Sequence, residues 1–197
     1  MPIPFRDATE LDELGAAAYL TIDEHPAGYM GAFFLVNARG EPLEFTYTRI
    51  ETPHTFLWRQ EDIRRHAARK ITSALLSLCP LVPRLILCRA EEIGSELFCQ
   101  DIQLSIPVCR VAPKLAVVPY TGQEARDESD TEEPPLHIFW FPDRPPEESP
   151  EQKLFRHLDS HRLLVEPFQR AAVGLSEVYK ADFLPKSPAG QAKAGKS

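Results

Sequence analysis

The sequence predicts an α+β fold, with a mixed, mostly antiparallel sheet, a central β-hairpin, one long packed helix and a C-terminal helical segment. Three observations lead to this prediction. Two apolar segments are joined by the turn sequence NARG at residues 37–40. An amphipathic stretch follows from residue 54 to residue 79, and two short apolar segments come after it. Strands and helices in this irregular order are typical of a sheet covered by helices.

The hairpin is the best-defined element. Its first strand, YMGAFFLVN at 29–37, is apolar throughout, as in a strand buried on both faces. Asn37 and Gly40 hold the first and fourth positions of a type I turn, where these residue types are favoured. The returning strand, PLEFTYTRIE at 42–51, alternates apolar and polar residues. It therefore has one packed face and one exposed face. A short strand, AYLTIDE at 18–24, is expected before the hairpin.

The long helix is predicted by apolar residues at three- and four-residue spacing. Ile63, Ala67 and Ile71 begin this stripe, and Pro80 ends the helix. A fully buried strand is expected at 84–88, and another at 102–112. Pro107 lies inside the second of these, which indicates an edge position or a bulge.

We divide the chain into four parts. Residues 1–118 form the α+β core domain, and 119–150 form an acidic and Pro-rich loop that contains one short aromatic strand, LHIFWF at 136–141. Residues 151–185 form the C-terminal helical segment, which Pro167 must kink or divide. Residues 186–197 are a disordered basic tail.

Composition and motifs exclude several classes of protein. No apolar run reaches the length of about 20 residues that spans a bilayer. The first residues lack a basic leader before an apolar core, so we expect a cytoplasmic protein with no membrane partner. The four cysteines are spaced 9 to 11 residues apart, unlike those of zinc-binding motifs. The G-x-x-x-x-G-K-[ST], G-x-G-x-x-G and G-x-S-x-G motifs are also missing.

Without a catalytic signature, the sequence favours a non-enzymatic adaptor or accessory subunit. It would act through protein–protein contacts in a bacterial-type cytoplasmic complex and would need no cofactor. Two groups of residues are candidates for the contacts. Trp58, Arg59, Arg65 and Arg69 lie on the long helix, where the arginines can also bind the phosphates of a nucleic acid. The aromatic residues Phe139, Trp140 and Phe141 form either a docking segment or an edge strand.

A second interpretation is a metal-dependent nuclease. Such enzymes place acids on a first strand, on the helix after a hairpin and at the end of the next strand, because Mg²⁺ needs several converging oxygen ligands. Acids occur in that order here: Asp23, then Glu61 or Asp62, then Glu91 or Glu92. Three strands, a helix and a fourth strand resemble the front half of a ribonuclease-H-like domain. The sequence departs from that pattern because Asp23 falls at the end of a short strand and no second helix–strand unit follows.

A third interpretation is a small-molecule sensing domain. Its pocket would lie between the hairpin and the long helix. Among the three interpretations, the sequence favours the adaptor.

Overall fold

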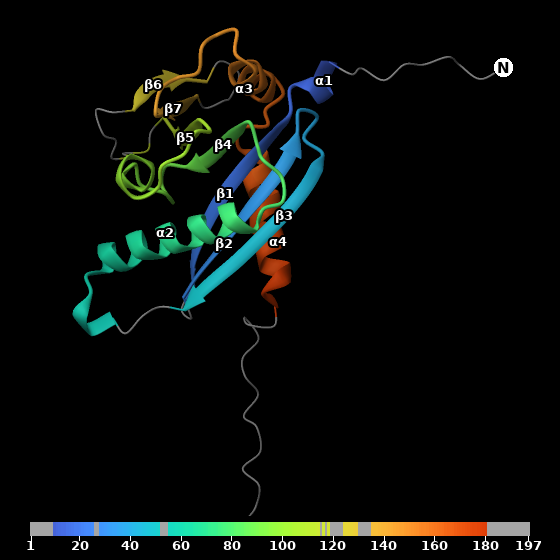
Figure 1. Cartoon of the computed structure of the whole chain (residues 1–197). Helices are drawn as coiled ribbons and strands as arrows, with labels where there is room; N and C mark the ends of the chain where they lie inside the picture. The colour runs from blue at the N-terminus through green and yellow to red at the C-terminus, as the bar shows by residue number, and fades with distance from the viewer. Residues whose placement is uncertain are drawn as a thin grey trace, which may run out of the picture.

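The computed structural model describes residues 10–25, 28–51, 55–114, 116, 118, 124–129 and 135–180. Its first half contains α1 (Glu10–Glu13), β1 (Ala16–His25), β2 (Gly28–Asn37), β3 (Pro42–Glu51), a 3₁₀ turn η1 (Thr55–Leu57) and α2 (Gln60–Leu78). The second half contains β4 (Leu85–Arg89), a π-helical turn η2 (Leu97–Asp101), β5 (Val108–Pro113), β6 (Ala125–Glu128), β7 (Leu136–Phe141), α3 (Pro150–Ser160) and α4 (Glu166–Val178). Figure 1 shows the arrangement.

The seven strands form one mixed sheet in the order β3-β2-β1-β4-β5-β7-β6. The central strand β4 runs parallel to β1 and to β5. The other four neighbouring pairs are antiparallel. The predicted fold class, α+β with a mixed and mostly antiparallel sheet, is confirmed.

The hairpin has the predicted turn. The side chain of Asn37 accepts hydrogen bonds from the backbone amides of Arg39 and Glu41, at 3.0 and 2.9 Å, and thereby holds the turn closed. Gly40 has a φ of 76°, a left-handed conformation that glycine adopts without strain. The register between β2 and β3 shifts at Leu35, where the hairpin contains a bulge. The strand β3 ends the sheet on this side.

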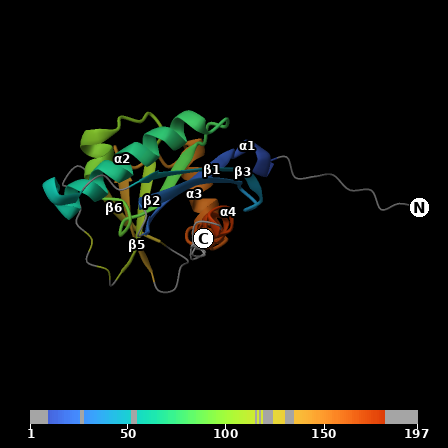
Figure 2. The same ribbon diagram turned by 90° about the horizontal axis from the view of Figure 1, so that it is seen from below.

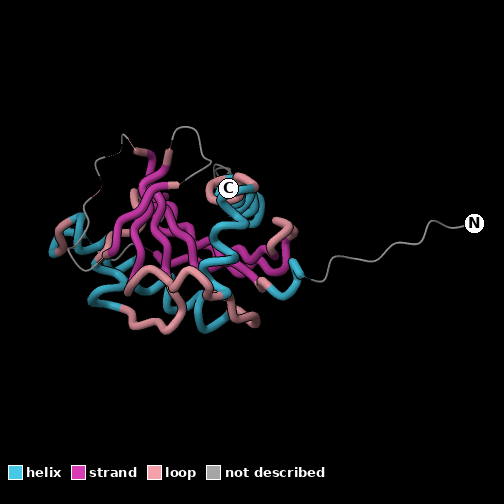
Figure 3. The backbone as a smooth tube through the Cα atoms, turned by 90° about the horizontal axis from the view of Figure 1, so that it is seen from above, coloured by secondary structure: helices cyan, strands magenta, loops and turns pink. Residues whose placement is uncertain are grey.

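Helices cover both faces of the sheet (Figures 2 and 3). On one face, the apolar stripe of α2 packs on β1 and β2, with Ile63, Ile71 and Leu75 fully buried. The helix can approach closely because Gly31 has no side chain: a Cβ there would lie 2.3 Å from a methyl group of Ile71. The helix begins at Gln60, later than the sequence predicts, and the expected start at residue 54 lies outside the described residues.

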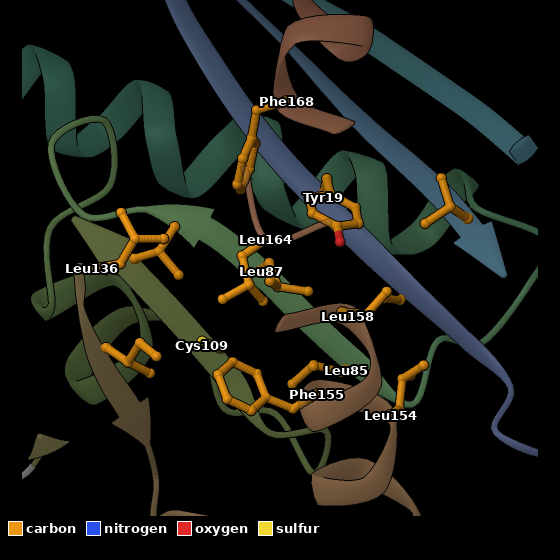
Figure 4. Close-up of a cluster of buried hydrophobic side chains, with 14 of the residues drawn as sticks. Tyr19, Leu85, Leu87, Cys109, Leu136, Leu154, Phe155, Leu158, Leu164 and Phe168 are labelled. Atoms are coloured by element: carbon orange, nitrogen blue, oxygen red, sulfur yellow. The ribbon is translucent and has the colours of Figure 1, made fainter. Parts of the chain in front are cut away.

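On the other face, α3 and α4 pack against β1, β4, β5 and β7 (Figure 4). Tyr19 of β1 meets Phe168 of α4 edge to face, with 5.0 Å between the ring centroids. Its hydroxyl donates a hydrogen bond to the carbonyl of Leu163, in the turn between α3 and α4. The C-terminal helical segment is divided into two helices by a turn at residues 161–165, and Pro167 lies in the first turn of the second helix.

Three segments differ from their predicted structure. The aromatic strand at 136–141 is β7, which lies between β5 and β6 and is not an edge strand. Residues 125–128, expected in a loop, form the edge strand β6, because their backbone pairs with β7. The strand expected at 102–112 begins only at Val108, directly after Pro107, which has no amide hydrogen to pair in a ladder.

Candidate functional site

The carboxyl ends of β1 and β4 are a favourable place for a ligand. These strands are parallel neighbours, and the chain leaves them in opposite directions, from β1 to β2 and from β4 towards β5. Ligands of sheets with parallel strands commonly bind in the crevice at such a point. A cleft of about 500 Å³ lies there, between the N-terminal half of α2 and the chain that follows β4. It is lined by Glu61, Arg64, Arg65, Ala68, Ala90, Glu91, Glu92, Gly94, Glu96 and Val118.

Glu92 closes the gap between β1 and the end of β4. The two strands are in register only as far as Leu20 and Cys88. Just beyond that point, Oε2 of Glu92 accepts hydrogen bonds from the Thr21 hydroxyl at 2.8 Å and from the Ile22 amide at 3.3 Å. Its Oε1 accepts a hydrogen bond from Arg89 at 3.1 Å. The carboxylate is therefore held by three donors.

Two arginines of α2 fix the walls of the cleft. Arg64 donates a hydrogen bond to the carbonyl of Glu91 at 2.9 Å. Arg65 makes a two-pronged contact with Asp101 of η2, with both distances at 2.8 Å. This contact lowers the pKa of the Asp101 carboxyl, mainly through the hydrogen bonds from Arg65. The helix is thus tied to both the loop after β4 and η2.

Arg110 supports the same wall from behind. It lies on β5 with a fully buried side chain and forms an ion pair with Glu124 at 2.6 Å. Its guanidinium also donates to the carbonyls of Ile93 and Ala90, at 3.0 and 3.4 Å. A buried charge needs such partners because burial removes its hydration. The loop that carries Glu91 and Glu92 is therefore anchored by a residue of the next strand.

Three of the five predicted acids share the cleft, and the other two lie elsewhere. Glu61, Glu91 and Glu92 line the cleft. Asp62 instead pairs with Arg59 at 2.8 Å, on the exposed side of the helix. Asp23 is exposed near the end of β1, which is ten residues long rather than short.

Strand geometry explains the position of Asp23. Successive side chains of a strand point to opposite faces. Asp23 therefore shares the face of Tyr19, which packs on α4, while Glu24 points towards α2. There Glu24 accepts a hydrogen bond from Gln60 at 3.0 Å.

The nuclease interpretation requires Mg²⁺, and the described residues do not fit that ion. Among them, no group of three or more His, Cys, Asp or Glu side chains is arranged to hold a metal. Glu92 lines the cleft with its side chain 20% exposed, and it already accepts hydrogen bonds at both of its oxygens. We therefore derive no metal-dependent step from this arrangement.

The predicted binding residues divide into two groups. Trp58, Arg59, Arg65 and Arg69 lie at or near the N-terminal half of α2 and are exposed. Phe139 and Trp140 are buried in the core, because β7 has a neighbour on each side and helices and loops over its faces. Phe141 is half-buried beside Phe98. Phe139 and Trp140 are therefore corrected from surface anchors to core residues.

Several residues of the site were not selected from the sequence. They are Thr21, Arg89, Arg110 and Glu124. Two of them could have been identified from the sequence, because Arg89 ends one apolar strand and Arg110 interrupts another. The pairing of Thr21 with Glu92 has no such signal.

The acidic loop does not bind the basic face of α2 in its described part. Glu124 pairs with Arg110, Asp127 with Arg144 and Glu128 with Lys114. Residues 130–133 lie outside the described residues.

Comparison with solved structures decides the fold. The catalytic domain of human endonuclease V superposes with a TM-score of 0.55 and 15% sequence identity, over 91% of this chain and 90% of that domain. The fold is that of endonuclease V. Endonuclease V from Streptomyces avermitilis superposes with a TM-score of 0.50 and 14% identity, over 89% of this chain and 92% of that one. The fold is thus ribonuclease-H-like.

Sequence comparison gives no further relationship. No protein-family model matches the chain. No curated protein matches it either.

The endonuclease V fold overturns the adaptor interpretation. The match covers 91% of this chain, and so the fold agrees better with the nuclease alternative than with the adaptor. The sensing interpretation also fails at this site, because none of the residues lining the cleft comes from the hairpin.

In the part of the chain that the structure describes, no helix is long and apolar enough to cross a membrane.

Proposed function

We propose that this protein binds nucleic acid, with the sugar–phosphate backbone along the Arg-rich face of α2 and across the adjoining cleft. One observation carries the proposal. Arg64 and Arg65 line a cleft at the carboxyl ends of β1 and β4, in a chain whose fold is that of an endonuclease over nine tenths of its length. This edge of the sheet is the place where ligands of related topologies bind.

The exposed side of α2 supplies the positive charge. Its basic residues are Arg64, Arg65, Arg69 and Lys70, with Arg59 just before the helix. Guanidinium groups bind phosphate oxygens through paired hydrogen bonds, and such contacts supply most of the sequence-independent affinity. Arg69 follows Arg65 by one helical turn, so both can reach one backbone.

The residues before α2 favour an unpaired strand. Phe56 is 82% exposed and Trp58 is 43% exposed, an unusual position for large aromatic side chains. Aromatic rings beside a basic groove bind single strands because bases stack on them. We therefore expect single-stranded DNA or RNA to bind more tightly than a duplex.

The acidic residues of the cleft limit the affinity of the protein for nucleic acid. Four glutamates and two arginines line it, so the cleft has no excess of positive charge. The phosphates must therefore lie mainly against the outer face of α2. We expect moderate affinity that falls steeply with salt, because the contacts are electrostatic. Cleavage is outside the proposal, since the carboxylates do not gather as metal ligands.

Fluorescence anisotropy with a labelled single-stranded oligonucleotide tests the proposal. The double variant Arg64→Ala/Arg69→Ala should weaken binding about tenfold or more at low salt, and should reduce the salt slope by about 0.7 for each phosphate that is no longer neutralised. The matched control is Lys153→Ala/Arg156→Ala, which removes the same charge from α3 on the other side of the sheet. Equal losses of affinity in both variants, or no binding by the natural chain, would refute the proposal.

A further inference from the structure

A fixed positive charge lies beside Glu92, one of the acids that line the cleft. Arg89 is the last residue of β4, and its side chain is about one-third exposed, at 32%. Its guanidinium lies 3.1 Å from Glu92 on one side and 5.1 Å from the ring centroid of Phe168 on the other. A cation between a carboxylate and an aromatic face is held by both, because the face of the ring carries partial negative charge.

Both oxygens of Glu92 already accept hydrogen bonds. One oxygen of Glu92 accepts a hydrogen bond from Arg89, and the other accepts from the Thr21 hydroxyl and the Ile22 amide. Oε1 of Glu92 accepts only the hydrogen bond from Arg89, so a divalent ion at its other lone pair would lie beside the guanidinium and be repelled by its charge. Displacing the guanidinium would break a hydrogen bond to a charged carboxylate, which is among the stronger ones in proteins.

The other acidic residues of the cleft do not form a metal site in place of Glu92. Glu61 and Glu91 also line the cleft, yet the described carboxylates form no group of three suited to a metal. Mg²⁺ usually keeps several waters and needs carboxylates in nearly ideal geometry, so a single occupied carboxylate does not retain it.

We propose that Arg89 is the resident cation of Glu92, in place of the divalent metal that this acid of the cleft would otherwise help to bind. Its guanidinium neutralises Glu92 at the carboxyl ends of β1 and β4, and the cleft accepts a polyanion without a metal ion. The statement that the cleft accepts a polyanion rests on the proposed nucleic-acid binding. The assignment of Arg89 is independent of that proposal, because it concerns the affinity of the protein for a metal.

Mn²⁺ binding measured by electron paramagnetic resonance, which detects the free ion, tests this inference. We expect the natural chain to hold no Mn²⁺ more tightly than the millimolar range of weak sites. Arg89→Ala should free Oε1 of Glu92, next to Glu91 in the chain, and raise Mn²⁺ affinity by about tenfold or more. Adding Glu92→Ala to that variant should remove the gain, and Arg89→Lys should keep the affinity as low as in the natural chain.

The matched control is Arg59→Ala, which frees Asp62 from an ion pair of the same i,i+3 spacing on the open surface. We expect no gain of Mn²⁺ affinity there. A Mn²⁺ site in the natural chain that Glu92→Ala removes would overturn the inference, and this measurement requires no Arg89 variant to fold. An Arg89→Ala protein that is folded but gains no affinity would also overturn it.

Oligonucleotide binding in EDTA separates the two proposals. If the natural chain binds an oligonucleotide equally well in EDTA and at the same ionic strength with Mg²⁺, both proposals are supported. If no oligonucleotide binds but Arg89→Ala still gains Mn²⁺ affinity, the nucleic-acid proposal fails and the assignment of Arg89 stands. If the natural chain binds the oligonucleotide only in the presence of Mg²⁺, the inference that the cleft accepts a polyanion without a metal ion is overturned.

Discussion

Arg110 and Glu124 form an ion pair in which both side chains are fully buried, with 2.6 Å between Nη1 and Oε1. The pair joins β5 to the residue that precedes β6. Because Arg110 also donates to the carbonyls of Ala90 and Ile93, it connects the loop after β4 to the rest of the sheet. The wall of the cleft is therefore anchored in the core.

Replacing one member of this pair should strongly destabilise the protein. We expect Arg110→Met to lower the free energy of unfolding by about 3–5 kcal/mol, because it leaves Glu124 buried without its charge partner. The double variant Arg110→Met/Glu124→Leu should recover part of this stability. Urea denaturation of the three proteins measures the difference. A decrease below about 1 kcal/mol in the single variant would mean that the pair is hydrated in solution.

Gly31 should not tolerate a methyl group. The added Cβ would meet Ile71 of α2 at 2.3 Å and the Thr21 carbonyl oxygen at 3.1 Å, both within the core. Overpacking of this kind costs about 1–3 kcal/mol, so Gly31→Ala should lower the melting temperature. Gly94→Ala is the control: its Cβ would meet only the carboxylate of Glu96 at 2.2 Å, a flexible side chain that can move away. Equal effects of the two substitutions would contradict the close packing of α2 on β2.

Asp101 should contribute to the loss of stability in acid. Its pKa lies below the usual 3.8 because Arg65 donates hydrogen bonds to its charged form. The unfolded chain therefore binds a proton more readily, and the stabilisation is complete above about pH 4 and is lost as the pH falls through the folded pKa. The melting temperature, measured from pH 5 to pH 2, should fall less steeply for Asp101→Asn. Arg65→Ala should flatten the same part of the curve, since the shift originates in Arg65.

The four cysteines should fall into two reactivity classes. Burial raises the pKa of the Cys88 thiol to about 12 and that of Cys109 well above its ordinary value, and both side chains are inaccessible. Cys79 and Cys99 are partly exposed. Because the thiolate is the reactive form, we expect Ellman's reagent to modify two thiols in the native protein and four in denaturant. Rapid modification in a Cys79→Ser/Cys99→Ser variant would contradict the buried positions.

Local sequence patterns predicted much of the fold. Asn37 and Gly40 specify the hairpin turn, the spacing of Ile63 and Ile71 specifies the buried face of α2, and Pro167 lies in the first turn of the last helix. Each of these features depends on residues close together in the chain. The same is true of the arginines on α2, which the sequence placed on an exposed helix face. Their neighbours across the cleft could not be predicted in this way.

The sequence by itself determined the class of the fold, the hairpin, the long helix and the acids that could form a site. Only the tertiary structure decided which residues meet. Thr21 and Glu92 are 71 residues apart, and they meet because β4 is inserted beside β1 and ends just before Glu92. The position of β7 between β5 and β6 likewise buries Trp140. Strand pairing sets these contacts, and its partners are chosen by burial over the whole domain rather than by local residue patterns.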